Sequence, residues 1–247
     1  MNSTSLLDIK NISKTYHSIH GEVTAIENLS FKVNKGKFIG IIGPSGCGKS
    51  TILNIISKLD NDHKGKVINN NATIGYMIQE DALFPWLTIL DNVLIGLKIK
   101  NELNEKNKEY AIDLLKKYGL YDFKDKYPSS LSGGMKQRVA LIRTLAIKPD
   151  ILLLDEPFSA LDYQTRLKVS NDVYNIIRNE KKTVIMVTHD ISEAISMCDE
   201  IIVLTKRPSK IKKIYKIELD NKSTPIKNRE ASNFAYYFKQ IWKDIDA

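Results

Sequence analysis

A glycine-rich loop carries the strongest chemical signal in the sequence. Residues 43–51 read Gly-Pro-Ser-Gly-Cys-Gly-Lys-Ser-Thr and fit the pattern G-x-x-x-x-G-K-[ST]. The loop follows an apolar run at residues 38–42, expected to be a buried strand, and it precedes residues 52–56, whose apolar spacing favours a helix. A glycine turn beside an incidental lysine is the alternative, but it leaves the flanking strand and helix unexplained. The sequence therefore predicts a site for a nucleoside triphosphate.

The residue types of this loop explain the predicted chemistry. Glycines let successive backbone N–H groups converge on phosphate oxygens, and the following helix N-terminus adds partial positive charge. Lys49 supplies a mobile charge to the outer phosphates, and the Ser50 hydroxyl can ligate Mg2+. The residues expected to bind the nucleotide here are Gly43, Pro44, Ser45, Gly46, Cys47, Gly48, Lys49, Ser50 and Thr51. Because Cys47 lies at a helix start, its thiol pKa is expected to fall, and the bound nucleotide is expected to protect it from thiol reagents.

Two carboxylates follow a second apolar run. Residues 151–154 read Ile-Leu-Leu-Leu, as expected of a central parallel strand covered on both faces, and Asp155 and Glu156 come next. One carboxylate can hold Mg2+ while the other orients or deprotonates a water. The alternative interpretation is an acidic helix N-cap.

Further polar residues are expected near the same edge of the sheet. His189 follows the apolar strand 183–187, where it can contact a terminal phosphate, and Gln79 ends the strand 74–79, where its amide oxygen can reach a metal or a water. Tyr16 follows the first strand and is able to stack on a purine ring, although an isolated aromatic there is more often surface packing.

A second glycine-rich turn also precedes a helix. Leu131-Ser132-Gly133-Gly134 leads into an expected helix at 135–147, which repeats the anion-binding arrangement of the first loop. An isolated S-G-G is a weak signal. It gains weight in a chain that already carries a triphosphate site.

The elements that position these residues alternate between strands and helices, which predicts an α/β fold with a mostly parallel sheet. Further strands are expected at 7–16, 24–33, within 63–75, at 199–204 and at 211–219. Helices are expected at 102–118, 163–179, 191–197 and, as an amphipathic tail, 227–242.

The composition is typical of a folded protein without a transmembrane segment. The chain has 247 residues, 43% of them hydrophobic and 27% charged, and its net charge is +8. The lysines are dispersed and form no stripe with aromatics, so nucleic acid is not expected as a partner. Two cysteines, Cys47 and Cys198, indicate a reducing cytoplasm. No signal peptide is expected, and no segment reaches the roughly 20 apolar residues that cross a bilayer, so any work at a membrane requires a partner that spans it.

Together these residues resemble the nucleotide-binding subunit of an ATP-binding cassette (ABC) transporter. Over Leu7 to about Ile211, six motifs occur in the family order. They are the Walker A loop 43–51, the Q-loop Gln79, the signature 131–135, Walker B 151–155 with the catalytic Glu156, the D-loop 159–162 ending in Asp162, and the switch His189; in addition, Tyr16 falls at the adenine-stacking aromatic. One departure is Met135, where the commonest signature carries Gln and with it a polar contact.

The resemblance implies an ABC ATPase fold: a P-loop core, an antiparallel β subdomain at the N-terminus and a helical signature subdomain. The expected division assigns 1–79 and 148–220 to the core, 80–147 to the helical subdomain and 221–247 to a helical tail. It also implies a head-to-tail dimer, in which each ATP lies between Walker A of one copy and the signature residues Ser132, Gly133 and Gly134 of the other.

The resemblance further implies the roles of the site residues. Lys49 and His189 stabilise charge on the transferring phosphoryl group, and Glu156 positions the attacking water. Ser50, Gln79 and Asp155 surround Mg2+, directly or through water.

A narrower resemblance concerns residues 81–93 and 207–211, which are similar to those of bacterial importers of nitrate, sulfonates and taurine. In that group the first segment receives a coupling helix of the membrane permease. Leu83, Phe84, Trp86 and Leu87 would then be exposed apolar residues; packing inside the helical subdomain is the alternative. The expected setting is the cytoplasmic face of the membrane, with an extracellular substrate-binding protein as an indirect partner.

Two other functions fit parts of the chain. A soluble ABC ATPase acting on nucleic acid or ribosomes would suit the basic charge, but the long coiled-coil insertion or second cassette of such proteins is missing. A P-loop kinase of small molecules leaves the signature unexplained. The transported molecule itself cannot be read from this chain.

Overall fold

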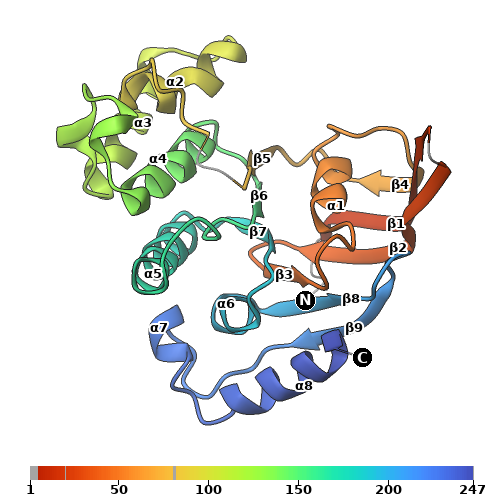
Figure 1. Ribbon diagram of the computed structural model, residues 1–247. Helices are drawn as coiled ribbons and strands as arrows, with labels where there is room; N and C mark the ends of the chain where they lie inside the picture. The colour runs from red at the N-terminus through yellow and green to blue at the C-terminus, as the bar shows by residue number, and fades with distance from the viewer. Residues whose placement is uncertain (1–4, 20, 80–81, 247) are drawn as a thin grey trace.

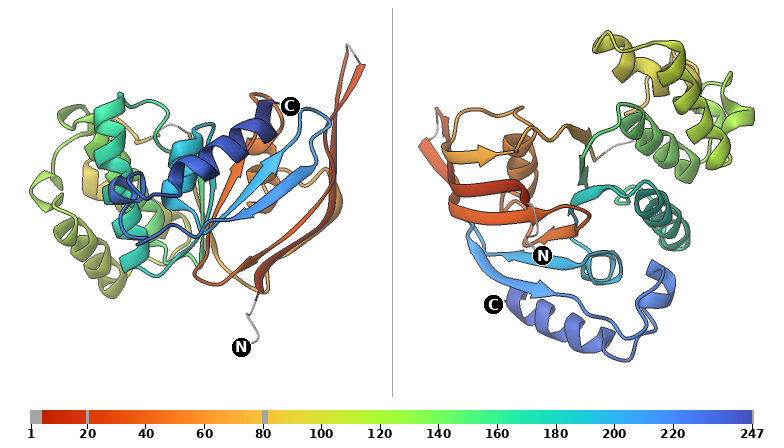
Figure 2. Two further views of the ribbon diagram at one scale, coloured as in Figure 1. Left: turned by 90° about the horizontal axis from the view of Figure 1, so that it is seen from below. Right: turned by 180° about the vertical axis from the view of Figure 1, so that it is seen from behind.

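The structure of the protein is a computed structural model that describes residues 5–19, 21–79 and 82–246. These residues form two sheets with helices packed around them (Figure 1). The helical lobe that contains α2, α3 and α4 and the long strands β1 and β2 lie at opposite ends of the molecule (Figures 1 and 2). The expected α/β fold with a mostly parallel sheet and an antiparallel sheet is confirmed.

The larger sheet has six strands in the order β5-β6-β7-β3-β8-β9, and only β9 runs antiparallel to its neighbour. Its strands are β5 (Ile74–Met77), β6 (Ile151–Asp155), β7 (Thr183–Val187), β3 (Phe38–Ile42), β8 (Glu200–Leu204) and β9 (Ile211–Lys216). Every residue of β3, β6 and β7 is buried, which explains why these strands read as continuous apolar runs rather than alternating ones. β9 ends three residues earlier than expected, although Ile217 and Leu219 beyond it are buried.

The smaller sheet is antiparallel, with the order β2-β1-β4, and consists of β1 (Ser5–Ser18), β2 (Gly21–Asn34) and β4 (Lys64–Ile68). Leu7 and Ile9 of β1 point into the core at alternate positions, and Ile12 does so after a register shift between Ile9 and Ile12.

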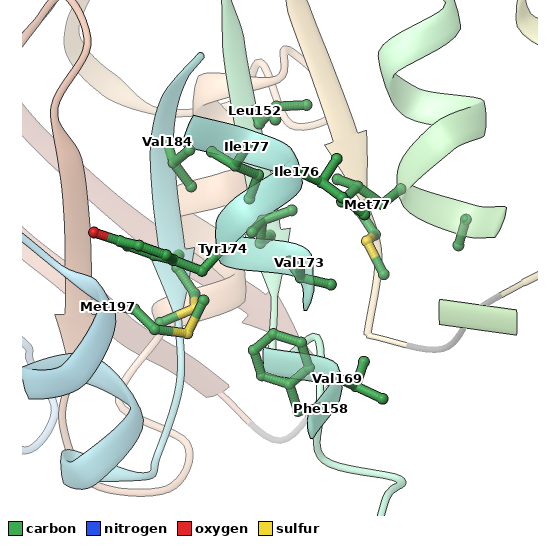
Figure 3. Packing of buried hydrophobic residues seen from close by; sticks show 14 of the residues in the cluster. Met77, Leu152, Phe158, Val169, Val173, Tyr174, Ile176, Ile177, Val184 and Met197 are labelled. Atoms are coloured by element: carbon green, nitrogen blue, oxygen red, sulfur yellow. The ribbon is translucent and has the colours of Figure 1, made fainter. Parts of the chain in front are cut away.

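Successive residues of the parallel strands point alternately into two hydrophobic cores, one on each face of the larger sheet. Phe38, Leu152 and Val184 face the core shared with α4, α5 and α6, and Figure 3 shows Ile177 of α5 packed against Leu152 and Val184. Their sequence neighbours face the second core, shared with α1 and the smaller sheet. Burying each such side chain contributes about 2 kcal/mol, so both cores stabilise the sheet that carries the site residues.

The remaining elements are helical. They are α1 (Lys49–Ile56), α2 (Ile89–Ile99), α3 (Glu105–Lys117), α4 (Gly133–Ala146), α5 (Tyr163–Asn179), α6 (Ile191–Met197), α7 (Pro225–Asn228) and α8 (Phe234–Asp246), with 3-10 turns at Tyr121–Phe123 and Pro128–Ser130. The sequence reasoning missed α2. Its start does carry a readable signal: the Thr88 hydroxyl accepts a hydrogen bond from the Asp91 backbone N–H at 3.1 Å and donates to the Asp91 carboxylate at 2.8 Å.

The tail forms two helices instead of the single one expected at 227–242. Polar side chains between them bond to other segments: Asn233 donates to the Glu218 carbonyl at 2.9 Å, and Ser232 donates to Asp220. Ile241 of α8 is fully buried in the first core, and α8 lies along the β8–β9 side of the sheet (Figure 2). Across the described residues, none of the helices combines the length and the apolar character needed to cross a bilayer. The division at residues 79/80, 147/148 and 220/221 stays a prediction.

Candidate functional site

The phosphate loop joins the end of β3 to the first residue of α1, Lys49. Gly46 and Gly48 have φ angles of 73° and 103°, which residues with a Cβ rarely adopt. Gly43 lacks a positive φ; a Cβ there would lie 3.0 Å from both Cys47 Sγ and Leu204 Cβ. The expectation that all three glycines serve the backbone conformation is therefore wrong for Gly43, which is required by close packing instead.

The loop borders a cavity of about 380 Å³. Its lining residues are Ser45, Gly46, Gly48, Lys49, Ser50, Thr51, Glu156 and Arg207. Lys49 is 7% exposed, and its Nζ donates to the carbonyl oxygens of Gly43 and Pro44 at 3.0 and 3.1 Å. The loop thus holds the lysine charge beside the exposed residues Ser45 and Gly46, an arrangement that suits a polyphosphate. A larger hollow of about 590 Å³ lies over the smaller sheet, and none of the residues lining it is a predicted site residue.

Asp155 is anchored at the end of β6 and faces the phosphate loop. Its Oδ1 accepts from Ser50 Oγ and its Oδ2 from the Tyr76 hydroxyl, both at 3.1 Å. Burial raises the pKa of the Asp155 carboxyl, the hydrogen bonds from Ser50 and Tyr76 oppose this, and the Glu156 charge adds to it. A buried carboxylate and a hydroxyl next to the cavity are the hard oxygen ligands that Mg2+ prefers, so these residues fit the ion.

Tyr76 is a site residue that sequence reasoning missed. It lies on β5, which pairs with β6, and it also donates to Asn54 Oδ1 at 3.2 Å. Burial and the neighbouring Asp155 raise the pKa of its phenol, which therefore stays a hydrogen-bond donor. No local pattern in the sequence indicates this contact, because it depends on the pairing of two strands.

Glu156, Gln79 and His189 meet at one carboxylate oxygen. Glu156 Oε2 lies 3.0 Å from His189 Nδ1 and accepts a weak hydrogen bond from Gln79 Nε2 at 3.5 Å. Glu156 has a φ of 43°, uncommon for a residue with a side chain, and its backbone N–H donates to the Val187 carbonyl at 2.9 Å. The residues predicted to act on water and terminal phosphate are therefore brought together at the carboxyl ends of β5, β6 and β7.

Tyr16 lies beside the phosphate-loop helix. Its hydroxyl is 3.1 Å from Thr51 Oγ1, its side chain is 43% exposed, and Lys14 Nζ lies 4.9 Å from the ring centre. An exposed ring at this place is available to stack on a base.

The signature residues begin α4 at an exposed end. Ser132 caps the helix, and its hydroxyl accepts from the Met135 N–H at 3.3 Å. Ser132 and Gly133 are exposed, whereas a Cβ on buried Gly134 would lie 2.6 Å from Val169 Cγ2. None of them lines the cavity at Lys49 in the described part of the chain. Ser132 faces outward, as a site completed by another copy requires.

One residue of the signature, Met135, and one of the D-loop, Asp162, have structural roles. Met135 is half-buried and packs against the first core, so its side chain has an apolar partner where the commonest signature has an amide. Asp162 is exposed and caps α5 by accepting from the Thr165 N–H at 3.1 Å, and the hydrogen bonds to Thr165 lower its pKa.

Cys47 does not behave as predicted. Its side chain is 1% exposed in the second core, and burial raises its pKa even though Lys49 acts in the opposite direction. The backbone of Cys47 belongs to the phosphate loop, but its thiol points away from the cavity. The expected fall of the Cys47 thiol pKa is therefore wrong, and the expected reactivity loses its physical basis.

We now expect the opposite result. Cys47 and Cys198 are both buried with raised thiol pKa values, and the thiolate is the reactive form. A titration with a disulfide reagent should find neither thiol reactive in the folded chain and both reactive after unfolding. Rapid modification of Cys47 that ATP prevents would contradict this expectation.

The apolar segment after Gln79 is partly exposed. Phe84 and Trp86 are 36% and 70% exposed, with ring centres 5.3 Å apart, and Leu87 is half-buried. Leu83 is only 8% exposed and belongs to the first core, so its predicted exposure is wrong: the chain turns it inward. Asp81, at the start of the segment resembling importers, lies outside the described residues.

Asn92 fixes the shape of this segment and was missed by sequence reasoning. It is fully buried on α2 and accepts from the Phe84 N–H at 2.7 Å. Its amide donates to the carbonyl oxygens of Phe84, Leu87 and Thr88 at 3.0–3.1 Å. Backbone bonds from one buried amide thus hold the two rings at the surface.

Arg207 was also missed as part of the site. It lies in the turn between β8 and β9, lines the phosphate cavity, and donates through Nε to the Gly46 carbonyl. The sequence showed only a basic turn and a similarity to importers at this place. A Cβ on Gly46 would lie 2.8 Å from Arg207 Nη2, so the guanidinium lies directly against the loop.

The fold and the phosphate-loop geometry define a P-loop nucleotide-binding protein. Residues 26–159 match the family described as ABC transporter. The chain is 44% identical over 251 residues to the uncharacterized ABC transporter ATP-binding protein YtlC of Bacillus subtilis (strain 168), which covers 98% of this chain and 96% of that protein. The chain belongs to the ABC transporter family.

Two further relatives carry substrate names. The aliphatic sulfonates import ATP-binding protein SsuB of Bacillus cereus is 38% identical over 248 residues, or 97% of this chain and 96% of that protein. The bicarbonate transport ATP-binding protein CmpD of Synechocystis sp. is 41% identical over 215 residues, which are 83% of this chain and 76% of that protein.

A solved structure gives the same fold. It is the dimeric ATP-binding cassette MJ0796 in a post-hydrolysis state, bound to ADP and Pi, with a TM-score of 0.72 and 34% identity over 86% of this chain and 99% of that chain. The predicted ABC ATPase fold is thereby confirmed. The chain is an ATP-hydrolysing, ATP-binding transporter subunit.

Proposed function

We propose that this chain energises a membrane importer of a small anion from the cytoplasmic face of the membrane. The observation that carries the importer assignment is the exposed pair Phe84 and Trp86, held outward by Asn92. Large apolar side chains exposed together mark interaction surfaces, and a helix of the permease is the occupant we assign to this one. An extracellular substrate-binding protein would act through that permease.

In the proposed mechanism, two copies pair head to tail around ATP. Lys49 and the N–H groups of the phosphate loop hold the phosphates, and Ser132 and Gly133 of the second copy cover them. Glu156 orients the attacking water and accepts its proton, and His189, 3.0 Å from Glu156, fixes that carboxylate and contacts the terminal phosphate.

Ser50 and Asp155, with Gln79, would hold Mg2+. The ion, when bound, supplies positive charge that offsets the charge developing on the phosphates. The 3.1 Å hydrogen bond between Ser50 and Asp155 already places these two oxygen ligands next to each other. Tyr76 holds the other carboxylate oxygen, which keeps Asp155 aimed at the loop.

The proposed substrate class is a small anion, which rests on the named relatives and on the resemblance of residues 81–93 and 207–211 to importers of nitrate, sulfonates and taurine. Relatives of similar identity are named for aliphatic sulfonates and for bicarbonate, both small anions, so sulfonates, taurine or nitrate are the substrates we propose to test. The site described here binds and hydrolyses ATP. In the proposed importer, the partner subunits select the transported anion. Neither the fold nor the relatives support a nucleic-acid function.

Trp86→Asp tests the permease surface. A charge on this exposed ring position should lower copurification with the membrane subunits and anion uptake by about tenfold, because it opposes apolar docking. ATP hydrolysis by the isolated chain should stay within twofold of wild type. The matched control is Ile99→Asp on α2, which is 75% exposed on the same lobe and should leave uptake intact. An equal loss of copurification and uptake in both variants would exclude a specific permease-binding surface at Phe84 and Trp86.

A further inference from the structure

A buried carboxylate outside the proposed mechanism lies next to His189. Glu193 of α6 is 3% exposed, and its Oε2 accepts from the Thr188 hydroxyl at 2.8 Å. The same hydroxyl accepts from the Asp190 N–H at 3.0 Å. Glu193 thus fixes the residues on both sides of His189, here called the switch loop (residues 188–190).

Arg166 of α5 joins this carboxylate to the D-loop (residues 159–162). Its Nη2 donates to the Leu161 carbonyl at 2.9 Å, one residue before Asp162. Its Nε lies 3.8 Å from Glu193 Oε1, and its Nη1 lies 3.7 Å from Asp190 Oδ2. One guanidinium therefore bonds to the D-loop on one side and forms ion pairs with the switch-loop region on the other.

The environment makes this ion pair sensitive to small displacements. Arg166 Nε is a buried atom with no hydrogen bond to the residues that the structure describes, and the Glu193 carboxylate at 3.8 Å is the charge that faces it. Attraction between charges rises steeply in a low-dielectric interior as their separation falls. A shift of the D-loop that moves Arg166 therefore changes the force on the carboxylates that hold the switch loop.

We propose that Arg166 and Glu193 are positioning residues that couple the D-loop to His189, so that the contact of Asp162 with a second copy sets the placement of His189 against Glu156. This proposal rests on the proposed function for the contact with the second copy. The coupling within one chain rests on three contacts of the structure: Leu161 to Arg166, Arg166 to Glu193, and Glu193 to Thr188.

The ionisation of Glu193 offers an independent readout of the coupling. Burial raises the pKa of Glu193 to about 7; the hydrogen bond from Thr188 and the charges of Arg166 and Arg229 favour ionisation, and Asp190 opposes it. Arg166 from α5, Arg229 after α7 and Asp190 at the start of α6 are the charged groups acting on it. The ion pair with Arg166 should therefore weaken as pH falls through 7, and with it the placement of His189.

The test compares ATP hydrolysis by Glu193→Gln, Arg166→Gln and the double variant of the full chain. Glutamine keeps an oxygen that accepts from Thr188 but removes the charge. Each single variant should lower kcat about tenfold with ATP affinity within twofold, and the double variant should lose no more than the worse single variant, because the residues act as one unit. The ratio of wild-type to Glu193→Gln turnover should rise between pH 6 and pH 8 with the dependence of one proton.

Two controls separate coupling from damage to the fold. Glu180→Gln removes another partly buried carboxylate at the far end of α5, where Tyr118 and Lys117 donate to it at 2.7 Å. This variant should lower the melting temperature without changing the pH dependence of turnover.

His189→Ala tests the proposed function itself, because normal turnover in that variant would overturn the site assignment. Loss in His189→Ala together with additive single variants, or with a ratio that is flat from pH 6 to pH 8, would overturn the coupling alone.

Discussion

Replacing Glu156 by Gln is expected to lower ATP turnover by about 100-fold or more while leaving ATP binding intact, because loss of a general base typically costs that much. The amide keeps the shape of the carboxylate and an oxygen for the contact with His189, so the phosphate loop is undisturbed. It cannot accept the proton of the attacking water. Bound ATP should therefore persist, and the closed dimer should accumulate.

Single-turnover hydrolysis and light scattering with ATP measure these two results. Glu109→Gln, at an exposed position on α3, is the matched control and should behave as wild type in both. Turnover of Glu156→Gln within a few-fold of wild type would remove Glu156 from the mechanism. Absence of ATP binding in that variant would instead show that the carboxylate supports the loop.

Replacing Ser132 by Arg is expected to lower ATP turnover by a similar factor, although Ser132 does not line the nucleotide cavity of its own chain. The substitution removes the cap of α4 and puts a bulky cation where the second copy's nucleotide is expected. Turnover should fall by about 100-fold. ATP affinity of the single chain should change little, since Ser132 does not line the cavity at Lys49.

Mixing this variant with Lys49→Met tests the head-to-tail arrangement directly. Each variant alone should be inactive, but a mixed dimer joins the intact Lys49 of one chain to the intact Ser132 of the other. With independent sites, an equal mixture should recover up to about a quarter of wild-type turnover, since half of the dimers are mixed and each has one intact site. No recovery, together with loss of ATP binding in Ser132→Arg, would place Ser132 in its own chain's site. A melting curve controls for the lost cap, which typically contributes about 1 kcal/mol.

The strands and helices that carry the site could be predicted where hydrophobic pattern alone decides them. β7 and helices α5 and α6 have the expected bounds because their apolar residues follow the period of each element and Asp162 and Asp190 cap the helices. The phosphate loop, the carboxylates and His189 could be placed together because parallel strands end at one edge of the sheet.

Side-chain directions within the motifs could not be predicted. Cys47 and Leu83 both lie in segments with a functional resemblance, yet both point into the core. A motif fixes which residues share a loop, whereas the packing of distant strands and helices fixes which of them face inward. Tyr76 and Arg207 could not be predicted as site residues for the same reason. Their contacts at the site depend on the pairing of β5 with β6 and on the turn after β8.

Asn92 has a consequence for how this kind of protein changes over generations. It bonds to the main chain of residues 84, 87 and 88 and to none of their side chains, so the path of the segment is independent of which rings it carries. If a permease docks here as proposed, mutations at 84 and 86 would alter the fit to that subunit while the backbone of the segment keeps its course. Under the proposed docking, the buried Asn92 amide would keep the backbone course constant, and the exposed side chains at 84 and 86 would be free to differ between transport systems.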